Sequence, residues 1–305
     1  MRANGMPVRP APADSASAPV AVRIYRPSAP LQSDVTFYYF VESAAALTDF
    51  LYPEWGNVRF GIAGDWLVRM PGETDAEPQL SVLFGPTDRH GEIVTAGGGK
   101  TIGFGLTPLG WHRLIGTDAG AMANRVTALN DALGVDGEVL RRALIGDADD
   151  AAAVARLEAL LVDLSARRPA MDPAVVRTDA ALRRRPADVD AFARAVGVSA
   201  RTLHRLCLRG FGFAPKRLLR RQRFLDTLGR VRSAVGDPVG ASLDAAYFDQ
   251  AHFYRDFRDF MAMSPRAYFS APRRLMTEAA AAQRRAGVTL SFLLPPQPDE
   301  SDHMV

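Results

Sequence analysis

The first hundred residues contain short apolar or alternating runs separated by turn residues, a pattern typical of β-strands. Turn sequences such as PEWG, PGET and TAGGG lie between the runs. Several short strands with this punctuation predict a small antiparallel barrel or sandwich. The predicted strands are Thr36–Glu42, Asn57–Ile62, Asp65–Met70, Leu80–Gly85 and Lys100–Leu106.

After Trp111 the apolar positions follow a helical spacing, and we predict helices over Asp118–Leu133, Gly137–Ile145 and Asp149–Arg168. The last of these carries one apolar stripe. Such a stripe packs against its own sheet or, as an alternative, forms a dimer seam, although only about two heptads are present where a coiled coil needs three or four. The stripe consists of Val154, Leu157, Leu161 and Leu164.

These patterns divide the chain into a first domain over residues 21–168 and a helical domain over residues 183–276. Residues 1–20 are rich in Pro, Ala and Ser and are expected to form a disordered arm. Residues 169–182 are expected to be a linker, and residues 277–305 a mostly disordered tail. The expected fold class is therefore α+β, a small β-barrel or sandwich followed by helices and then an all-α domain.

Residues 188–209 have the pattern of a helix-turn-helix unit. A short amphipathic helix meets the turn Gly197-Val198-Ser199, in which Gly197 can adopt a positive φ and Ser199 can cap the next helix. The second helix has Leu203, Leu206 and Cys207 spaced to face inward. Its other face presents Arg201, His204 and Arg205, which suits insertion into a DNA major groove.

A second unit of the same kind spans Ser242–Phe260, with a break near Ala246–Phe248. Its second helix holds Phe253, Phe257 and Phe260 inward. Its outward face offers Gln250, Ala251, His252 and Arg255. Pro215–Val231 is predicted to be one longer helix between the units, so the two units can enter successive major-groove faces about 34 Å apart.

The charge distribution supports a nucleic-acid partner for the helical domain. Residues 183–274 hold 19 Lys and Arg against 8 Asp, a net charge of +11, whereas the remaining 18 basic and 26 acidic residues give −8. A basic segment joined to a mildly acidic one is the expected footprint of a DNA-binding domain with a non-binding partner domain. Double-stranded DNA is therefore the expected partner.

The helical domain strongly resembles that of the AraC/XylS family of bacterial transcription regulators, over about 90 residues of the chain. The resemblance implies a DNA-binding unit of seven helices that acts as a monomer. The chain departs from the family pattern at Ala246, where a glycine is usual, and at Cys207, where a large apolar residue is usual. The matching residues are Ala193, Gly197, Val198, Ser199, Arg201, Leu203, Arg205, Leu206, Gly212, Pro215, Arg223, Asp249, Gln250, His252, Phe253, Arg255, Phe257, Ser264, Pro265 and Tyr268.

The resemblance assigns base reading to seven residues, Arg201, His204, Arg205, Gln250, Ala251, His252 and Arg255. An arginine there can donate two hydrogen bonds to a guanine, a contact that contributes about 1–3 kcal/mol of discrimination. The alternative for Arg205 is a phosphate or a neighbouring acid, and the alternative for His252 is burial against the turn. The expected phosphate contacts are Ser199, Arg209, Lys216, Arg220, Arg221 and Arg223.

The first domain gives no ligand from sequence alone. In the family it often senses a small molecule or mediates dimerisation, frequently with a cupin-like barrel. The segments Gly85–Arg89 and Gly103–Gly116 are similar to those of regulator domains of unassigned ligand, and strand aromatics such as Trp55 and Trp66 line a pocket or simply form the core. His90 and His112 are isolated, so no metal or cofactor is expected.

The leading hypothesis is a sequence-specific regulator whose first domain binds an effector or dimerises. One alternative is a regulator without an effector, whose first domain serves only dimerisation or contacts with RNA polymerase or another protein. An enzyme is the other alternative, but the sequence offers no metal triad or nucleophile–base pair. No apolar run is long enough to cross a membrane and no secretory signal is evident, so a cytoplasmic location is expected. The single cysteine, Cys207, fits a small core residue better than a redox sensor.

Overall fold

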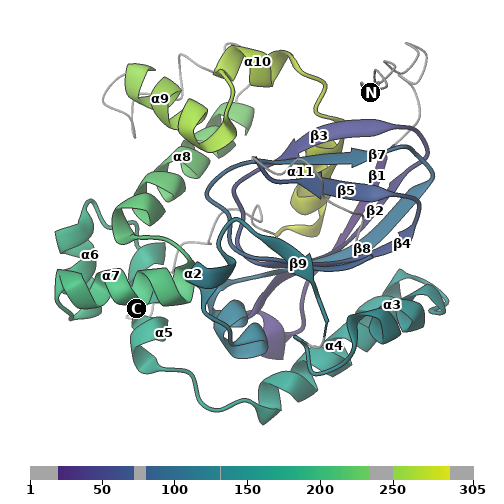
Figure 1. Cartoon of the computed structure of the whole chain (residues 1–305), viewed down its shortest axis with the longest axis horizontal. Coiled ribbons are helices and arrows are strands. Elements are labelled where there is room, and N and C mark those ends of the chain that lie inside the picture. Colours follow the sequence, from purple (N-terminus) through teal and green to yellow (C-terminus); the bar gives the residue numbers. More distant parts are fainter. Residues whose placement is uncertain (1–19, 72–79, 131, 234–249, 289–305) are drawn as a thin grey trace, which may run out of the picture.

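The first half of the chain forms two antiparallel β-sheets, shown in Figure 1 for this computed structural model. The structure describes residues 20–71, 80–130, 132–233 and 250–288. One sheet has the strand order β1-β2-β8-β4-β6-β9 and the other has the order β3-β7-β5. The strands are β1 (Val20–Tyr25), β2 (Val35–Ser43), β3 (Leu47–Leu51), β4 (Asn57–Ala63), β5 (Trp66–Arg69), β6 (Ser81–Phe84), β7 (Gly91–Thr95), β8 (Gly99–Leu106) and β9 (Val126–Ala128).

The remaining described elements are helical. They comprise η2 (Ala29–Leu31), α1 (Pro108–Gly110), η3 (Trp111–Ile115), α2 (Ala119–Met122), α3 (Gly137–Ile145), α4 (Asp150–Arg167), α5 (Pro173–Arg183), α6 (Val189–Val196), α7 (Ala200–Phe211), α8 (Pro215–Ser233), α9 (Gln250–Met261), α10 (Pro265–Ser270) and α11 (Arg274–Ala286). The expected α+β class, with sheets first and an all-helical part last, is confirmed.

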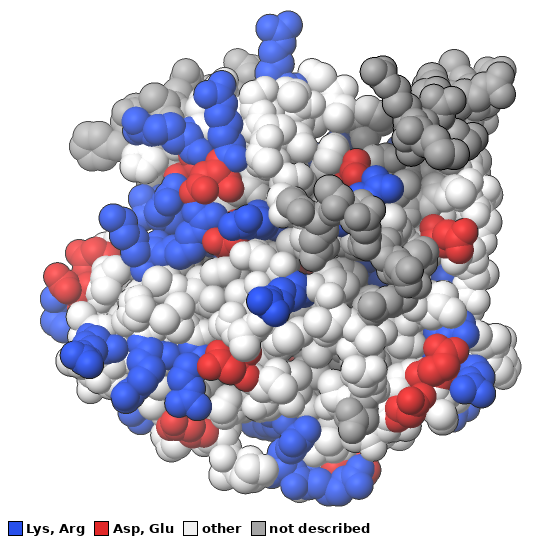
Figure 2. Space-filling model, viewed as in Figure 1, with Lys and Arg blue, Asp and Glu red and all other residues white. Residues whose placement is uncertain are grey.

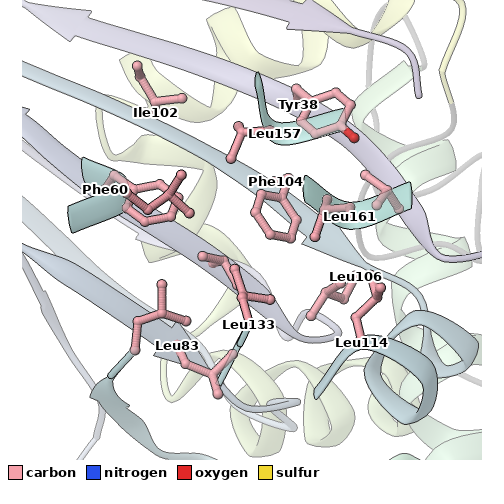
Figure 3. Packing of buried hydrophobic residues seen from close by; sticks show 14 of the residues in the cluster. Tyr38, Phe60, Leu83, Ile102, Phe104, Leu106, Leu114, Leu133, Leu157 and Leu161 are labelled. Atoms are coloured by element: carbon pink, nitrogen blue, oxygen red, sulfur yellow. The ribbon is translucent and has the colours of Figure 1, made fainter. Parts of the chain in front are cut away.

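The larger sheet is buried on both faces because its strands carry apolar residues at successive positions. Tyr38 and Phe40 of β2 point to the side covered by α3 and α4, whereas Phe37, Tyr39 and Val41 point to the other sheet. Figure 3 shows Leu157 and Leu161 of α4 packed among residues of this sheet. Burial of apolar area on both faces stabilises the sheet.

The apolar stripe of α4 is therefore a core contact within the chain. Leu157 and Leu161 are fully buried and Leu164 is nearly so, all in one cluster with the larger sheet. Their burial excludes these three leucines from a dimer seam, so the seam alternative is wrong for this stripe. α4 starts at its Asp149 cap, whose carboxylate accepts a hydrogen bond from the backbone N–H of Ala152.

The helix expected over Asp118–Leu133 is wrong for most of its length. Among the described residues of this segment only α2 is helical; it ends at its C-cap Ala123, where ψ is 130°, and Asn124 then takes a positive φ of 57°. The chain continues as β9, which pairs with β6 at the edge of the larger sheet. Backbone pairing with a neighbouring strand has prevailed over the local helix propensity of this segment.

Two boundaries also differ from expectation. The expected linker contains α5, whose Val175, Ala181 and Leu182 are buried against the first helix-turn-helix unit, so α5 belongs to the helical domain. The expected tail begins inside α11, which is helical to Ala286. The expected disordered arm, except for Val20, and the tail beyond residue 288 lie outside the described residues.

Candidate nucleic-acid interface

The first helix-turn-helix unit consists of α6, a short turn and α7, and it forms for the local reasons expected from sequence. Asp188 caps α6 through a 2.7 Å bond from the N–H of Ala191. Gly197 ends α6 with φ 76°, a left-handed conformation that suits glycine. Ser199 caps α7 by accepting a 3.2 Å bond from the N–H of Thr202. These caps fix the angle at which α7 leaves the turn.

The inward face of α7 is anchored in the core of this unit. Leu203 and Cys207 are fully buried with Phe192 and Val196 of α6, whereas Leu206 is only half-buried. Burial raises the pKa of the Cys207 thiol to about 12. The thiol is therefore protonated at neutral pH, and Cys207 acts as a small core residue.

The outward face of α7 presents Arg201, His204 and Arg205 to solvent. Their spacing of three and four residues places them on one side of the helix. Arg209 lies one turn beyond Arg205, and its side chain is 74% exposed. The structure thus brings the first-unit residues predicted from sequence together on one exposed face.

In the second unit, α9 is held by a cluster of aromatic rings. Phe253, Phe257 and Phe260 are fully buried around Phe224 of α8, with ring centroids 5.0–6.1 Å from that of Phe224. Arg255 is exposed on the opposite side, and His252 is half-buried.

The rest of the second unit is described only in part. Gln250 and Ala251 begin α9, but their side chains are outside the described residues. The segment expected to form the first helix of this unit, with Ala246, falls within residues 234–249, which are also outside the described residues.

The spacer α8 supplies both exposed and engaged cations. Lys216 is exposed and Arg223 half-buried, whereas Arg220 forms ion pairs with Asp256 at 2.5 Å and Asp259 at 2.9 Å. Ser199 lies at the solvent-facing start of α7, where its hydroxyl caps the helix. Figure 2 shows Lys and Arg side chains gathered over the helices α6–α9, with acidic side chains between them.

Arg221 does not lie where a phosphate contact requires it. Its side chain is 2% exposed, and its guanidinium carbon lies 4.0 Å from the ring centroid of Trp55 in the first domain. Burial lowers its pKa to about 9. The prediction of a phosphate contact is therefore wrong for Arg221 in this structure, and its cation–π contact joins the two domains instead.

The segment Gly85–Arg89, noticed in the sequence without a role, lies at the interface between the domains. Asp88 accepts a 2.6 Å hydrogen bond from Arg217 of α8 and a 2.8 Å bond from Asn124. The backbone N–H of His90 donates to the carbonyl of Phe260 in α9 at 2.9 Å. Sequence alone gave no signal for the contacts with Arg217 and Phe260, because these residues lie more than 100 positions from their partners.

Segment Asp118–Ala121 of the first domain lies beside the outward face of α7. A hollow is lined on one side by Asp118 and Gly120 and on the other by reading-face residues, including Arg201 and Arg205. Gly120 lies so close to Leu208 that a Cβ on it would stand 3.0 Å from the Leu208 carbonyl oxygen. The first domain therefore restricts the space on one side of the reading helix.

A cavity of about 70 Å³ lies between the two sheets and α11. Its walls are mostly apolar, but Glu54, Asn57 and Arg59 also line it, and Arg59 of β4 is 9% exposed. The Nε of Arg59 donates to the Tyr39 hydroxyl at 3.1 Å, and its Nη1 has no hydrogen-bond partner among the described residues. Alternation along β4 places Asn57 on the same face as Arg59, and this was the sequence signal that could have identified the pair.

Within the part of the chain that the structure describes, no group of three or more His, Cys, Asp or Glu side chains could hold a metal ion. No helix among the described residues is long and apolar enough to cross a membrane.

Comparisons with known proteins bear on the helical domain. Residues 192–271 match a family described as helix-turn-helix domain. A search of curated proteins gives no match. Similar solved structures include ToxT from Vibrio cholerae, with 9% identity over 82% of this chain and 96% of that chain at a TM-score of 0.41. They also include the AraC-like transcriptional activator CuxR, with 16% identity over 64% of this chain and 77% of that chain at a TM-score of 0.29.

Proposed function

We propose that this chain, whose residues 192–271 form a helix-turn-helix domain of the AraC type in a DNA-binding transcription regulator, reads two adjacent major-groove segments with α7 and α9. The observation that carries the proposal is the exposed face of α7 with Arg201, His204 and Arg205. That face is polar and basic, and the turn caps on either side of Gly197 hold it rigidly. An exposed, pre-oriented helix of this kind fits a major groove about 12 Å wide.

The two readers have complementary roles in this proposal. Arg205 pairs with a guanine through two hydrogen bonds, while Arg255, with Gln250, Ala251 and His252 beside it at the start of α9, reads the second segment. The spacer α8 has 19 residues and so extends about 28 Å at 1.5 Å per residue. This length is comparable to one helical turn of DNA, about 34 Å, which is the separation that two successive major-groove faces require.

Phosphate contacts hold the readers in register without reading sequence. Lys216, Arg209 and Ser199 are placed for this role because they lie at the surface on or beside α7 and α8. Arg223 is half-buried and contributes through its exposed part. Arg220 must leave Asp256 and Asp259 before it can bind a phosphate.

We further propose that the first domain senses a small-molecule effector in the cavity between the sheets. The supporting observation is Arg59, a nearly buried cation that lines this cavity and whose Nη1 has no hydrogen-bond partner among the described residues. A buried donor without a partner is unfavourable, so a ligand with an anionic or hydrogen-bond-accepting group gains affinity there.

An alternative first-domain function is dimerisation, or contact with RNA polymerase or another protein, without an effector. The exposed Val139 and Ile145 of α3 and Val162 of α4 are apolar side chains that could contribute to such a contact. Sedimentation velocity at several protein concentrations distinguishes a dimer from a monomer. A cytoplasmic location accords with the function, because bacterial DNA is in that compartment.

Selection of binding sites from random double-stranded DNA by the full chain tests the reading function. The expected result is enrichment of sites with two short motifs about one helical turn apart. Enrichment of no sequence, with binding that only weakens as salt rises, would mean that the basic surface binds DNA without reading it.

A further inference from the structure

The helix α11 follows the second reading unit but packs into the first domain. It lies against β1 and β3, and Figure 1 shows it behind the smaller sheet, between the two sheets. Leu275 and Ala282 are buried in the same cluster as the inner faces of both sheets. The inner apolar surface of the first domain is thus covered by the last helix of the chain that the structure describes.

Both ends of α11 are capped by charged side chains of the first domain. Asp49 of β3 is fully buried and accepts a 3.0 Å bond from the N–H of Met276 at the start of the helix. At the other end, Arg26 donates to the carbonyls of Ala286 at 2.5 Å and Gly287 at 2.6 Å. A carboxylate at the N-terminus and a guanidinium at the C-terminus both match the helix dipole.

The residue before α11 strengthens the attachment. Arg273 donates from Nε to Asp49 at 2.6 Å and from Nη2 to the carbonyl of Phe50 at 2.7 Å. The capping residue of α11 itself makes no side-chain capping bond, so Asp49 supplies the cap that the local sequence lacks. The position of α11 is therefore determined by the first domain.

The same helix limits the size of the effector cavity. Met276, Ala279 and Gln283 form one of its walls. The remaining volume, about 70 Å³, holds roughly five water molecules at about 10–15 Å³ each. Most small-molecule sites enclose ligands that need more space than this. Of the cavity walls, α11 is the one formed by a single separate helix, so its departure would enlarge the cavity.

A chain of ring contacts joins the start of α11 to the second reading unit. Arg273 stacks over the ring of Tyr268 in α10 at 3.9 Å, and Tyr268 packs edge-on against Phe257 of α9 with ring centroids 5.3 Å apart. At the same time, Asp88 holds α8 and segment Asp118–Ala121 stands beside α7. Docked α11 thus completes a set of contacts that fixes both readers against the first domain.

We propose that α11 is a strap that competes with the effector for the cavity, so that effector binding releases the second reading unit for DNA. The effect on DNA rests on the proposed function, whereas the competition for the cavity does not. With the strap docked, the reading helices are held in one arrangement beside the first domain. With the strap released, they are free to adopt the spacing that DNA requires, and affinity for DNA rises.

The test compares two variants of the full chain that add the same charge to α11. Ala282→Asp places a carboxylate in the buried interface with the sheets, and Thr277→Asp places one on the exposed face of the same helix. Hydrogen exchange measures release of α11. Fluorescence of 1-anilinonaphthalene-8-sulfonate, an apolar anion, measures access to the cavity, and fluorescence anisotropy measures binding to a DNA site selected by the wild-type chain.

Ala282→Asp is expected to remove the exchange protection of α11, because a buried unpaired charge strongly opposes docking. The affinities for the fluorescent anion and for DNA should then each rise by about five- to tenfold. This factor corresponds to a docked state of α11 that exceeds the released state by the same ratio in the wild-type chain. Thr277→Asp should leave all three within about twofold, since it contributes only at the helix terminus. In the wild-type chain, the fluorescent anion should itself reduce protection of α11.

A milder variant covers the case in which Ala282→Asp fails to fold, as judged by its circular dichroism. Arg26→Ser removes two bonds to the end of α11 from an exposed residue and should shift the three measurements in the same direction by about two- to threefold. If a variant with released α11 binds the fluorescent anion and DNA with the same affinities as the wild-type chain, the proposal that α11 is a strap is wrong. A failure of the proposed function gives a different result. In that case neither the wild-type chain nor any variant selects a DNA sequence, while the affinity for the fluorescent anion still rises when α11 is released.

Discussion

The ion pair between Asp88 and Arg217 gives the clearest quantitative prediction for the contact between the domains. The two atoms are 2.6 Å apart, and the side chains are only 10% and 20% exposed. Burial opposes the charge of Asp88, but Arg217 and the Asn124 hydrogen bond outweigh it and hold the pKa of Asp88 below its ordinary value. The carboxylate is therefore charged at neutral pH, and the pair is fully formed.

The magnitude follows from this geometry. A hydrogen bond to a charged group contributes about 1.5–3 kcal/mol, and exposed ion pairs contribute about 0.2–1 kcal/mol. Arg217 retains Asp259 as a second partner when Asp88 is removed, which reduces the loss. We expect a coupling free energy of about 1–2 kcal/mol between Asp88 and Arg217, toward the lower part of the range for charged hydrogen bonds.

A double-mutant cycle with Asp88→Ala, Arg217→Ala and the double variant measures this coupling from urea unfolding at pH 7 and physiological salt. The matched control is the cycle for Asp163 and Arg167, an ion pair on α4 whose side chains are 60% and 66% exposed. The control should give at most about 0.5 kcal/mol. A coupling for Asp88 and Arg217 no larger than that of the control would refute the account of the domain contact.

Three further predictions follow from burial. Leu161→Ala should lower the free energy of unfolding by about 2–5 kcal/mol without changing the sedimentation coefficient, because Leu161 is fully buried within the chain; a change of oligomeric state with little loss of stability would restore the dimer seam. Burial lowers the pKa of His90 below its ordinary 6.5, so its contribution to the free energy of unfolding is complete above pH 6.5 and is lost as the pH falls toward the folded-state pKa. The melting temperature of His90→Gln should lack this decline at low pH, and a pH profile identical to that of the wild-type chain would contradict the prediction. Cys207 should resist iodoacetamide at pH 8 in the folded chain and react in urea, since its pKa is about 12; rapid labelling of the folded chain, followed by mass spectrometry, would show that α7 opens.

Sequence patterns predicted those elements whose local residues agree with their final packing. The strands around Phe40 and Phe104 alternate or are apolar throughout, and the first helix-turn-helix unit has its caps and glycine at the required positions. The phenylalanines of α9 were placed inward by their spacing alone. At each of these places local propensity and tertiary packing favour the same structure.

The elements that sequence did not predict depend on distant partners. α11 is Ala- and Arg-rich and gave little local signal, because its docking surface and its caps, Asp49 and Arg26, come from the first domain. The expected helix around Asn124 gave way to strand pairing for the same kind of reason. Arg221 was assigned to phosphate from its position in a basic run, and only the structure reveals Trp55 beneath it. Contacts across more than 100 residues leave no periodic trace in the sequence.

The central claim, that α7 and α9 each read their own DNA segment, is tested most directly by two single variants of the full chain. Arg205→Ala should relax base preference in one motif of the selected site and Arg255→Ala in the other, each by about 1–3 kcal/mol at one position. Lys216→Ala is the control, because a lost phosphate contact should weaken binding to all sequences alike and reduce the salt slope by about one. If Arg205→Ala and Arg255→Ala instead weaken all sites uniformly, as the lysine variant does, the two helices do not read bases.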